Sequence, residues 1–347
     1  MTSQIRVLVT GAGSGVGQGI IKCLKISSLP LHLTVADISP LNPAFYRVDD
    51  ACLIPRVEEP GALAKILSVL ADKKIDVLLI GSEFELGFFS RHAAEIESKT
   101  GTKVMVSPLK AVQLSNDKYE TYKFLAANQL PFPLTHLPAD LEDAAVKAGE
   151  IGYPCMIKPR CGTSSRAVAI VQNEEELRRV YPKVTSPVVQ QLIMRPSKQL
   201  AAEYTCGLFK TTEGSLVGPF TARRALKGGD SWIVEVDDFA FLKPVLTRIG
   251  EALDFKGPLN VQLMYDGKNA VAFEFNCRFS GTAPIRAHFG FNEPEMMIRN
   301  YFLKQKIGNI KIKKGMAFRY MEEVMVEGVT VNNLTAPYPQ GIVPSWF

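Results

Sequence analysis

Val271-Ala-Phe-Glu-Phe-Asn-Cys-Arg-Phe-Ser-Gly-Thr-Ala-Pro-Ile-Arg286 carries polar and apolar side chains in alternation. Glu274, Asn276 and Arg278 occupy every second position, and apolar residues fill the positions between them. A period of two predicts a β-strand with one polar and one apolar face. On such a strand the three polar side chains project about 7 Å apart along a single face.

The chemistry of that polar face indicates a divalent metal beside an anion. A carboxylate and a carboxamide offer the oxygen ligands that Mg²⁺ prefers. Arg278, next in the row, would supply a planar fork for a phosphate or a carboxylate. The alternative is an edge strand whose polar face only meets water.

Composition and charge narrow the class of protein. A chain of 347 residues with 46% hydrophobic and 22% charged residues is typical of a soluble globular protein with two or three domains. The net charge of +5 is mild and scattered, so we expect no nucleic acid as a partner, while a basic lining for anionic small molecules fits equally well. No apolar run approaches the roughly 20 residues that span a bilayer, so no membrane is expected.

The cysteines and the N-terminus indicate a cytoplasmic location. The six cysteines form no CxxC pair, and the four histidines are isolated from one another. We therefore expect reduced thiols rather than disulfides or a zinc site. The chain reaches a polar, glycine-rich turn by residue 11, which is not the pattern of a signal peptide.

Residues 1–107 alternate between short apolar runs and amphipathic segments. The predicted strands are 5–9, 31–37, 75–81 and 103–106, and helices are expected after the first turn and over 61–73 and 86–99. Glycines at 11, 13, 15 and 17 would let the backbone approach a ligand at a helix N-terminus. This order predicts an open α/β domain of Rossmann type.

The same turn also permits a dehydrogenase. Asp37 stands where a ribose-binding acid could lie, and Tyr119 and Lys123 form a Tyr-x-x-x-Lys pair with Ser107 upstream. A glycine-rich first turn is a weak signal, however, and the pair falls early, before a second full α/β region. We keep this as a disfavoured alternative.

Gly81-Ser-Glu-Phe-Glu85 follows directly from a predicted strand. Ligands tend to bind at the carboxyl ends of strands in open sheets, so Glu83 and Glu85 are candidates for substrate contact. Acids that open the next helix, where its dipole favours them, are an equally good interpretation.

The middle of the chain places a lysine below a loop of small residues. We expect one helix over 109–128, a proline-broken connection, a helix near 141–150 and a strand over 155–158 that carries Lys158. The loop 160–166, which includes Ser164, could fold over phosphates, although a plain hairpin is the alternative. Further strands are predicted at 167–171, 188–193 and 200–207, with a helix at 174–180.

In this order the motifs resemble the ATP-grasp superfamily over essentially the whole chain, and in particular its carbamoyl-phosphate synthetase-like branch. They are Asn116-Asp-Lys118, Gly152-Tyr-Pro-Cys-Met-Ile-Lys158, Val189-Gln-Gln-Leu-Ile193, the strand with Glu203, and Asn260-Val-Gln262 paired with Glu274-Phe-Asn276-Cys-Arg278. The resemblance implies a Rossmann-like (pre-ATP-grasp) domain at 1–107, then a two-lobed ATP-grasp domain. Its linker helices and small lobe would cover 108–195 and its large lobe 196–333, before a tail at 334–347.

The resemblance also implies roles for single residues. Lys118, Lys158 and Ser164 would contact the phosphates of ATP, with Glu203 near the nucleotide. The adenine pocket would be formed by Ile157 and the hinge Gln190, Gln191, Leu192 and Ile193. The ligands of Mg²⁺, or of Mn²⁺ in its place, would be Gln262, Glu274 and Asn276. Arg278 and Arg223 would stabilise the transferred phosphoryl group, and Arg286 would either clamp the substrate carboxylate or form a surface ion pair.

Two positions depart from the usual family pattern. Many relatives have an acid where Gln190 stands, which puts adenine or ribose contacts in doubt. Many also have Asp or Glu where Gln262 stands. The loop 160–166 has fewer glycines than the most mobile lids.

The activity implied is that of an ATP-dependent carboxylate–amine or carboxylate–thiol ligase that forms an acyl phosphate. Its partners would be a small-molecule carboxylate and an amine or other nucleophile, and a homodimer stays open. Full carbamoyl-phosphate synthesis is disfavoured, because that enzyme uses two ATP-grasp units. The alternatives are the dehydrogenase and a catalytically silent ATP-binding protein. The acceptor pocket would lie between residues 81–85, 223–232 and 280–288.

Overall fold

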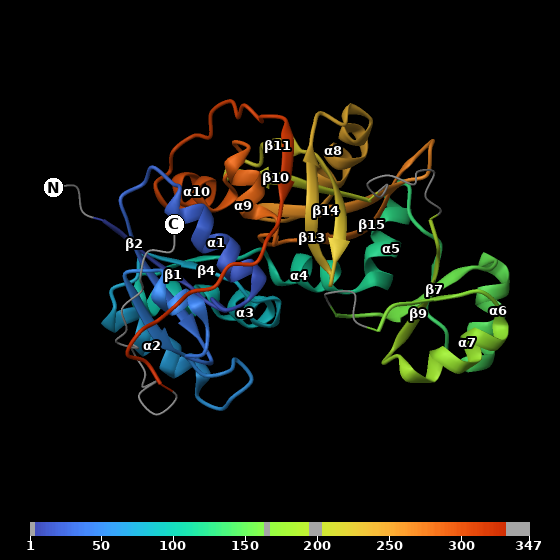
Figure 1. Ribbon diagram of the computed structural model, residues 1–347, viewed down its shortest axis with the longest axis horizontal. Helices are drawn as coiled ribbons and strands as arrows, with labels where there is room; N and C mark the ends of the chain where they lie inside the picture. The colour runs from blue at the N-terminus through green and yellow to red at the C-terminus, as the bar shows by residue number, and fades with distance from the viewer. Residues whose placement is uncertain (1–3, 163–166, 194–202, 331–347) are drawn as a thin grey trace.

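The structure is a computed structural model of the chain, and it describes residues 4–162, 167–193 and 203–330. It contains a parallel sheet (blue in Figure 1), a large antiparallel sheet (yellow to red) and a small antiparallel sheet (green). The predicted α/β and α+β architecture is therefore confirmed. Ser164 and the tail 334–347 lie outside the described residues.

The parallel sheet is formed by the first third of the chain. Its strand order is β3 (Asp50–Leu53), β2 (Leu31–Asp37), β1 (Ile5–Val9), β4 (Val77–Leu79) and β5 (Lys103–Met105). It is accompanied by α1 (Gly15–Lys25), a 3₁₀ turn at Pro43–Tyr46, α2 (Ala62–Asp72) and α3 (Glu83–Thr100). The central strand β1 is apolar because it is buried on both faces, as expected for a parallel sheet.

Gly17, just after the turn that follows β1, and Gly81, which follows β4, allow backbone segments to approach closely. A Cβ on Gly17 would lie 2.3 Å from the Gly11 carbonyl oxygen, and a Cβ on Gly81 would lie 2.2 Å from the Thr10 carbonyl oxygen. Asp37, which the dehydrogenase interpretation uses for a ribose, accepts the backbone N–H of Gly13 at 2.7 Å. Close approach of backbone segments thus accounts for the glycines at 17 and 81, whereas a Cβ on Gly15 would meet nothing within 4 Å.

The predicted helix over 109–128 is two helices, α4 (Leu109–Asn116) and α5 (Lys118–Ala127). Asp117 separates them with an extended backbone, and its carboxylate caps α5 by accepting the N–H groups of Tyr119 and Glu120. Periodicity did not reveal the break because both segments keep their apolar residues in helical spacing. The break turns Lys118 toward the small sheet, where its N–H donates to the Arg160 carbonyl oxygen at 2.9 Å.

The small sheet runs in the order β6 (Thr135–His136), β9 (Pro187–Gln191), β7 (Cys155–Pro159) and β8 (Ala169–Val171). The helices α6 (Leu141–Ile151) and α7 (Glu174–Val180), followed by a 3₁₀ turn at Tyr181–Lys183, complete this lobe. Cys155 and Ile157 point into a core shared with these helices. The alternate residues Met156 and Lys158 line a cavity on the other side.

The large sheet runs in the order β15 (Ala270–Asn276), β14 (Gly257–Tyr265), β10 (Glu203–Lys210), β12 (Ala222–Lys227), β13 (Asp230–Val236) and β16 (Gly315–Phe318). Strand β11 (Leu216–Phe220) also pairs with β10. A 3₁₀ turn at Ala240–Leu242 leads into α8 (Lys243–Ala252). The edge strand β15 is followed by α9 (Ala283–His288), α10 (Glu293–Met297) and a π-helical turn at Ile298–Phe302.

A β-bulge interrupts the pairing of β14 with β15. Leu263 pairs with Ala272, but Gln262 pairs with Glu274, so Phe273 is the extra residue. The core-facing residues are Ala270 and Ala272 before the bulge and Phe275 and Cys277 after it. The strict alternation predicted for this strand is therefore wrong by one residue, and both Phe273 and Glu274 face the cavity.

The hydrophobic clusters show which parts of the fold share a core. One cluster joins the parallel sheet and α1 to Phe209, Phe220 and the helices after β15. The small lobe has its own cluster. Within the described ranges, every helix is too short or too polar to cross a membrane.

We expect Gly17→Ala to destabilise the protein by about 1–3 kcal/mol, because the new methyl group must displace a backbone oxygen. The urea midpoint followed by circular dichroism measures this change. Gly15→Ala in the same turn is the matched control, since nothing lies within 4 Å of its Cβ position and its effect should stay within about 0.5 kcal/mol. Equal midpoints for the two variants would contradict the packing role of Gly17.

Candidate active site

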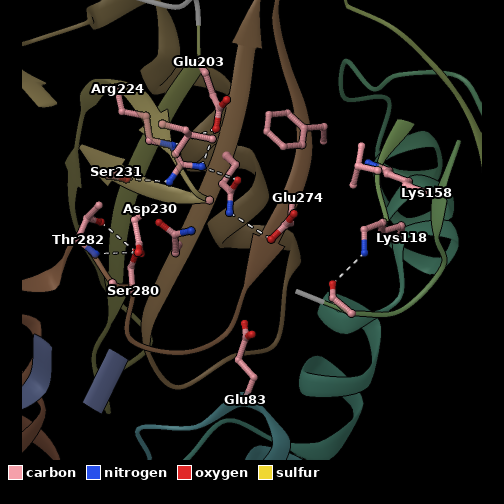
Figure 2. A pocket seen from close by; sticks show the side chains of 18 of the residues that line it. Glu83, Lys118, Lys158, Glu203, Arg224, Asp230, Ser231, Glu274, Ser280 and Thr282 are labelled. Atoms are coloured by element: carbon pink, nitrogen blue, oxygen red, sulfur yellow. Dashed lines mark hydrogen bonds and ion pairs between the residues drawn. The ribbon is translucent and has the colours of Figure 1, made fainter. Parts of the chain in front are cut away.

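A cavity of about 490 Å³ lies where the small lobe, the large sheet and the parallel sheet meet. Figure 2 shows Lys118 and Lys158 on one side, Glu274, Glu203 and Arg224 facing them, and Glu83 at one end. Ten of the residues predicted from the sequence line the cavity, namely Lys118, Lys158, Gln190, Gln191, Leu192, Ile193, Glu203, Gln262, Glu274 and Arg278.

The two lysines come from different elements and meet in this cavity. Lys158 on β7 is 4% exposed, and its ammonium group forms no ion pair or hydrogen bond with the described residues; it lies 5.9 Å from the centre of the Phe273 ring. Its pKa is lowered from 10.5 to about 8, chiefly because the ammonium group is buried; Glu274 opposes this lowering and Lys118 adds to it. Lys118 at the start of α5 donates to the Gly162 carbonyl oxygen at 3.0 Å. A buried ammonium group without a carboxylate partner indicates a binding place for an anion.

The hinge residues lie at the edge of β9 with their side chains engaged. Gln190 is buried and donates its amide to the Thr135 hydroxyl at 2.8 Å. The side-chain oxygen of Gln191 accepts the Leu134 N–H at 3.1 Å. The side chains of both glutamines are thus held by β6 and the residue before it, and the Gln191 N–H also donates to the Leu134 carbonyl oxygen at 2.8 Å.

Ile157 does not line the cavity. It is fully buried in the core of the small lobe, so its prediction as part of the adenine pocket is corrected. Its neighbour Met156 faces the cavity instead, as the alternation along β7 requires.

Glu274 is held by two amides. Its Oε1 accepts the Gln262 amide at 3.1 Å and the Asn276 amide at 2.9 Å. Its Oε2 accepts no hydrogen bond from the described residues. Asn276 is buried beside it and is not part of the cavity lining itself. A carboxylate oxygen directed at the cavity fits Mg²⁺, which takes few protein ligands and completes its shell with water and phosphates.

The orientation of Gln262 does not fit the ligand role predicted for it. Its side-chain oxygen accepts Arg224 Nη2 at 2.8 Å, so the amide nitrogen faces Glu274. Among the described residues, no three His, Cys, Asp or Glu side chains form a self-contained metal site. A metal at Glu274 would therefore depend on oxygens supplied by a bound ligand.

Arg224, rather than Arg223, reaches the cavity from β12. Arg223 was predicted to stabilise a phosphoryl group, but it projects from the opposite face of the strand and pairs with Glu235, with Nε at 2.9 Å. Arg224 is 8% exposed and donates from Nε to the buried Glu203 at 2.9 Å. The sequence contains both arginines, but it does not show which face each occupies.

Arg278 and Glu83 close one end of the cavity. Arg278 lies just beyond β15 and donates to Glu83, the first residue of α3, with Nε at 2.8 Å. Glu83 therefore both opens the helix and lines the cavity, so the two interpretations of this acid are compatible. The end is completed by Ser14, Gly15, Ser280, Thr282 and Arg319.

Glu85 is directed into the parallel sheet and not into the cavity. It is 7% exposed and accepts the Thr10 hydroxyl at 2.6 Å. Burial raises its pKa to about 7, and the hydrogen bond from Thr10 opposes that rise. It is therefore not a substrate contact in this structure.

Arg286 is a buried structural residue and not a surface group. Both Arg286 and its partner Glu293 are 0% exposed, and Arg286 Nη1 donates to Glu293 at 2.8 Å. It also donates to the Asn260 side chain, the Thr205 hydroxyl and the Cys206 carbonyl oxygen. Burial raises the pKa of Glu293, and Arg286 opposes that rise. The predicted substrate clamp and its surface alternative are both corrected.

The residues of the dehydrogenase alternative are not assembled. Tyr119 and Lys123 lie on α5 outside the cavity, where Lys123 pairs with Glu120 at 2.7 Å. Ser107 bonds to the backbone of Lys256. None of the three lines the cavity beside the glycine-rich turn.

The chain matches two family models. Residues 7–105 match the PylC-like, N-terminal domain, and residues 115–213 match the ATP-grasp domain. The arginine-specific carbamoyl phosphate synthase large chain of Bacillus subtilis is 25% identical over 302 residues, which cover 81% of this chain and 28% of that one. The carbamoyl phosphate synthase large chain of Halobacterium salinarum is 21% identical over 301 residues, 80% of this chain and 28% of that one. The chain thus spans less than a third of the length of these relatives.

Solved structures share the fold. The N5-carboxyaminoimidazole synthetase of Staphylococcus aureus, complexed with ADP, gives a TM-score of 0.73 at 15% identity over 92% of this chain and 83% of that one. A second match is the biotin carboxylase domain of the Hydrogenobacter thermophilus 2-oxoglutarate carboxylase, in complex with MgADP, ADP and bicarbonate. It gives a TM-score of 0.73 at 15% identity, over 90% of this chain and 74% of that one.

We expect Arg286→Met to destabilise the protein by about 3–5 kcal/mol, because it leaves the Glu293 carboxylate buried without its partner. Urea unfolding measures the loss. The double variant Arg286→Met/Glu293→Met should recover most of it, since it removes both charges together. A stably folded Arg286→Met with weakened substrate binding would restore the clamp interpretation.

Proposed function

This chain contains an ATP-grasp domain behind a PylC-like N-terminal domain, and from that premise we propose that it is an ATP-dependent carboxylate–amine ligase. A carboxylate–thiol ligase is the closest variant of the same chemistry. ATP and Mg²⁺ are the cofactors used by the ATP-grasp family. The acceptors, the order of steps and the residue roles below are our proposal.

The observation that carries the proposal is the unpaired ammonium group of Lys158, buried opposite the Glu274 carboxylate. An anion between them would neutralise the lysine, and a cation bound to that anion would neutralise the carboxylate. Magnesium-bound ATP phosphates meet both requirements. The adenine would lie along Leu192 and Ile193 at the hinge, where Met156 completes an apolar wall.

Glu274 and Asn276 would hold the metal. When bound, Mg²⁺ supplies Lewis-acid stabilisation of the negative charge on the phosphate oxygens. The two amides on Glu274 Oε1 fix the carboxylate in place, so that its second oxygen is directed at the cavity without reorganisation.

The chemistry needs no side-chain nucleophile. A carboxylate oxygen of the substrate attacks the γ-phosphorus of ATP, the bond to the β,γ-bridging oxygen breaks, and ADP leaves. An amine then attacks the acyl carbon, its proton is lost to solvent, and inorganic phosphate leaves. Lys118, Lys158 and Arg278 offset the charge that develops on the transferred group.

The acceptor would bind at the end of the cavity next to Arg278 and Glu83. This end carries two guanidinium groups, Arg278 and Arg319, together with the hydroxyls of Ser280 and Thr282. A small carboxylate suits this lining, as does an amine-bearing partner next to Glu83. We keep the cytoplasm as the proposed location, in line with six cysteines of which none is in a disulfide.

A screen for ADP release over amino acids, small carboxylates and sugar-linked acids tests the ligase function. We expect ADP and phosphate to form in equal amounts with the right acceptor pair. Glu274→Ala should lower turnover at least about 100-fold, because it removes the proposed metal anchor. Glu97→Ala, a partly exposed acid of α3 paired with Lys103, is the control for loss of a carboxylate elsewhere. Near-normal turnover by Glu274→Ala would exclude this metal site.

The affinity for ATP should fall as the pH rises through about 8, the pKa of Lys158. The phosphates bind the ammonium form, so deprotonation above this pH removes a positive charge from the site. Isothermal titration between pH 6.5 and 9.5 measures the effect. Lys158→Met should bind ATP weakly and with little pH dependence over this range. A wild-type affinity that stays constant up to pH 9.5 would exclude Lys158 as a phosphate ligand.

A further inference from the structure

We propose that Arg224 is a positioning residue that orients Gln262, and through it Glu274, for the divalent metal. This inference rests on the proposed function. It differs from the family-based expectation in two ways. Gln262 orients Glu274 and is not itself a metal ligand. The arginine of β12 that affects the site is Arg224 rather than Arg223, and it acts through Gln262.

The guanidinium group of Arg224 joins three neighbouring strands from β12. It donates to Glu203 on β10 with Nε at 2.9 Å and Nη2 at 2.6 Å, and to the Ser231 hydroxyl on β13 with Nη1 at 3.1 Å. Its Nη2 also donates to the Gln262 oxygen on β14 at 2.8 Å. The side chains of Arg224 and Glu203 are 9% and 7% exposed, so the pair is held in one arrangement and shielded from water.

The chemistry of its neighbours allows Gln262 only one orientation. An arginine can only donate hydrogen bonds, and an ionised carboxylate can only accept them. Gln262 lies between the two, with Arg224 at 2.8 Å from its oxygen and Glu274 at 3.1 Å from its nitrogen. Turning the amide over would place its N–H groups against the donors of Arg224 and its oxygen against the acceptor oxygen of Glu274.

This fixed amide determines which atoms remain for a metal. Gln262 and Asn276 both donate to Glu274 Oε1, which leaves Oε2 as the carboxylate oxygen that faces the cavity. The oxygen of Gln262 is directed at a cation instead, which is a poor place for a second cation. Glu274 Oε2 is therefore the protein oxygen that remains for the metal, and the route from Arg224 to the metal runs through Gln262.

A direct electrostatic role for Arg224 predicts the opposite sign. If Arg224 acted only as a nearby charge, its replacement by methionine would strengthen Mn²⁺ binding by removing repulsion, and lysine would leave it unchanged. If Arg224 is a positioning residue, replacing it with either methionine or lysine should weaken Mn²⁺ binding. Lysine keeps the charge beside Glu203, but its single nitrogen cannot also reach Ser231 and Gln262 with the geometry of a guanidinium fork.

The experiment is a titration of Mn²⁺ in the presence of saturating ADP, followed by electron paramagnetic resonance. We expect Arg224→Lys to weaken Mn²⁺ affinity about 10-fold or more, as is usual for loss of a residue that orients a ligand. Arg224→Met should weaken it as well. Arg223→Lys is the matched control, because it disturbs an arginine–glutamate pair of the same strand on the opposite face and should leave the affinity within about twofold.

A double-variant cycle then tests the route through Gln262. If Arg224 acts through that amide, Arg224→Lys/Gln262→Met should bind Mn²⁺ no more weakly than Gln262→Met alone. The proposal would be overturned if the fold-losses of Mn²⁺ affinity of the two single variants multiplied in the double variant. It would also be overturned if Arg224→Lys bound Mn²⁺ as tightly as Arg223→Lys. If the wild-type protein and its ADP complex bind no Mn²⁺ at all, the proposed function fails and this inference with it.

Discussion

One continuous hydrophobic cluster joins the parallel sheet to the large antiparallel sheet, and the geometry of the cavity depends on it. Helix α1 packs so closely on α9 that a Cβ on Gly19 would lie 3.2 Å from Pro284. Because the two sheets are fixed to each other, Glu83 at the start of α3 meets Arg278 at the end of β15 across 195 positions of sequence. The end of the cavity that carries Glu83 and Arg278 is thus built by apolar packing some distance from these charges.

The charged groups around the cavity fall into two kinds. The arginines are satisfied within the protein, Arg224 by Glu203 and Gln262, and Arg278 by Glu83. Lys158 has no such partner among the described residues and lies in a lobe with its own hydrophobic cluster. The arginines are therefore held in the large-sheet wall by contacts within the protein, whereas the lysine of the small lobe is left for the anion that we propose to bind between the two walls.

The sequence was sufficient for the fold class, and the motifs that resemble the ATP-grasp superfamily were sufficient to find ten of the residues that line the cavity. It was not sufficient where contacts between residues distant in sequence determine whether a side chain is buried and which way it points. Arg286 is buried because Glu293 and Asn260 surround it, and its local sequence resembles a surface helix. Arg223 and Arg224 are adjacent, and only the pairing of β12 with β10 and β13 determines which faces the cavity. Asp117 ends one helix and caps the next within an unbroken helical period.

The bulge at Phe273 has a consequence for how this chain is aligned with its relatives. A strand without the extra residue would carry its core positions two apart throughout, whereas here the interval from Ala272 to Phe275 is three. An alignment without a gap at this point would match either the residues before Phe273 or those after it to positions on the wrong face. Glu274 and Asn276 would then be compared with core residues of any strand that lacks the extra residue.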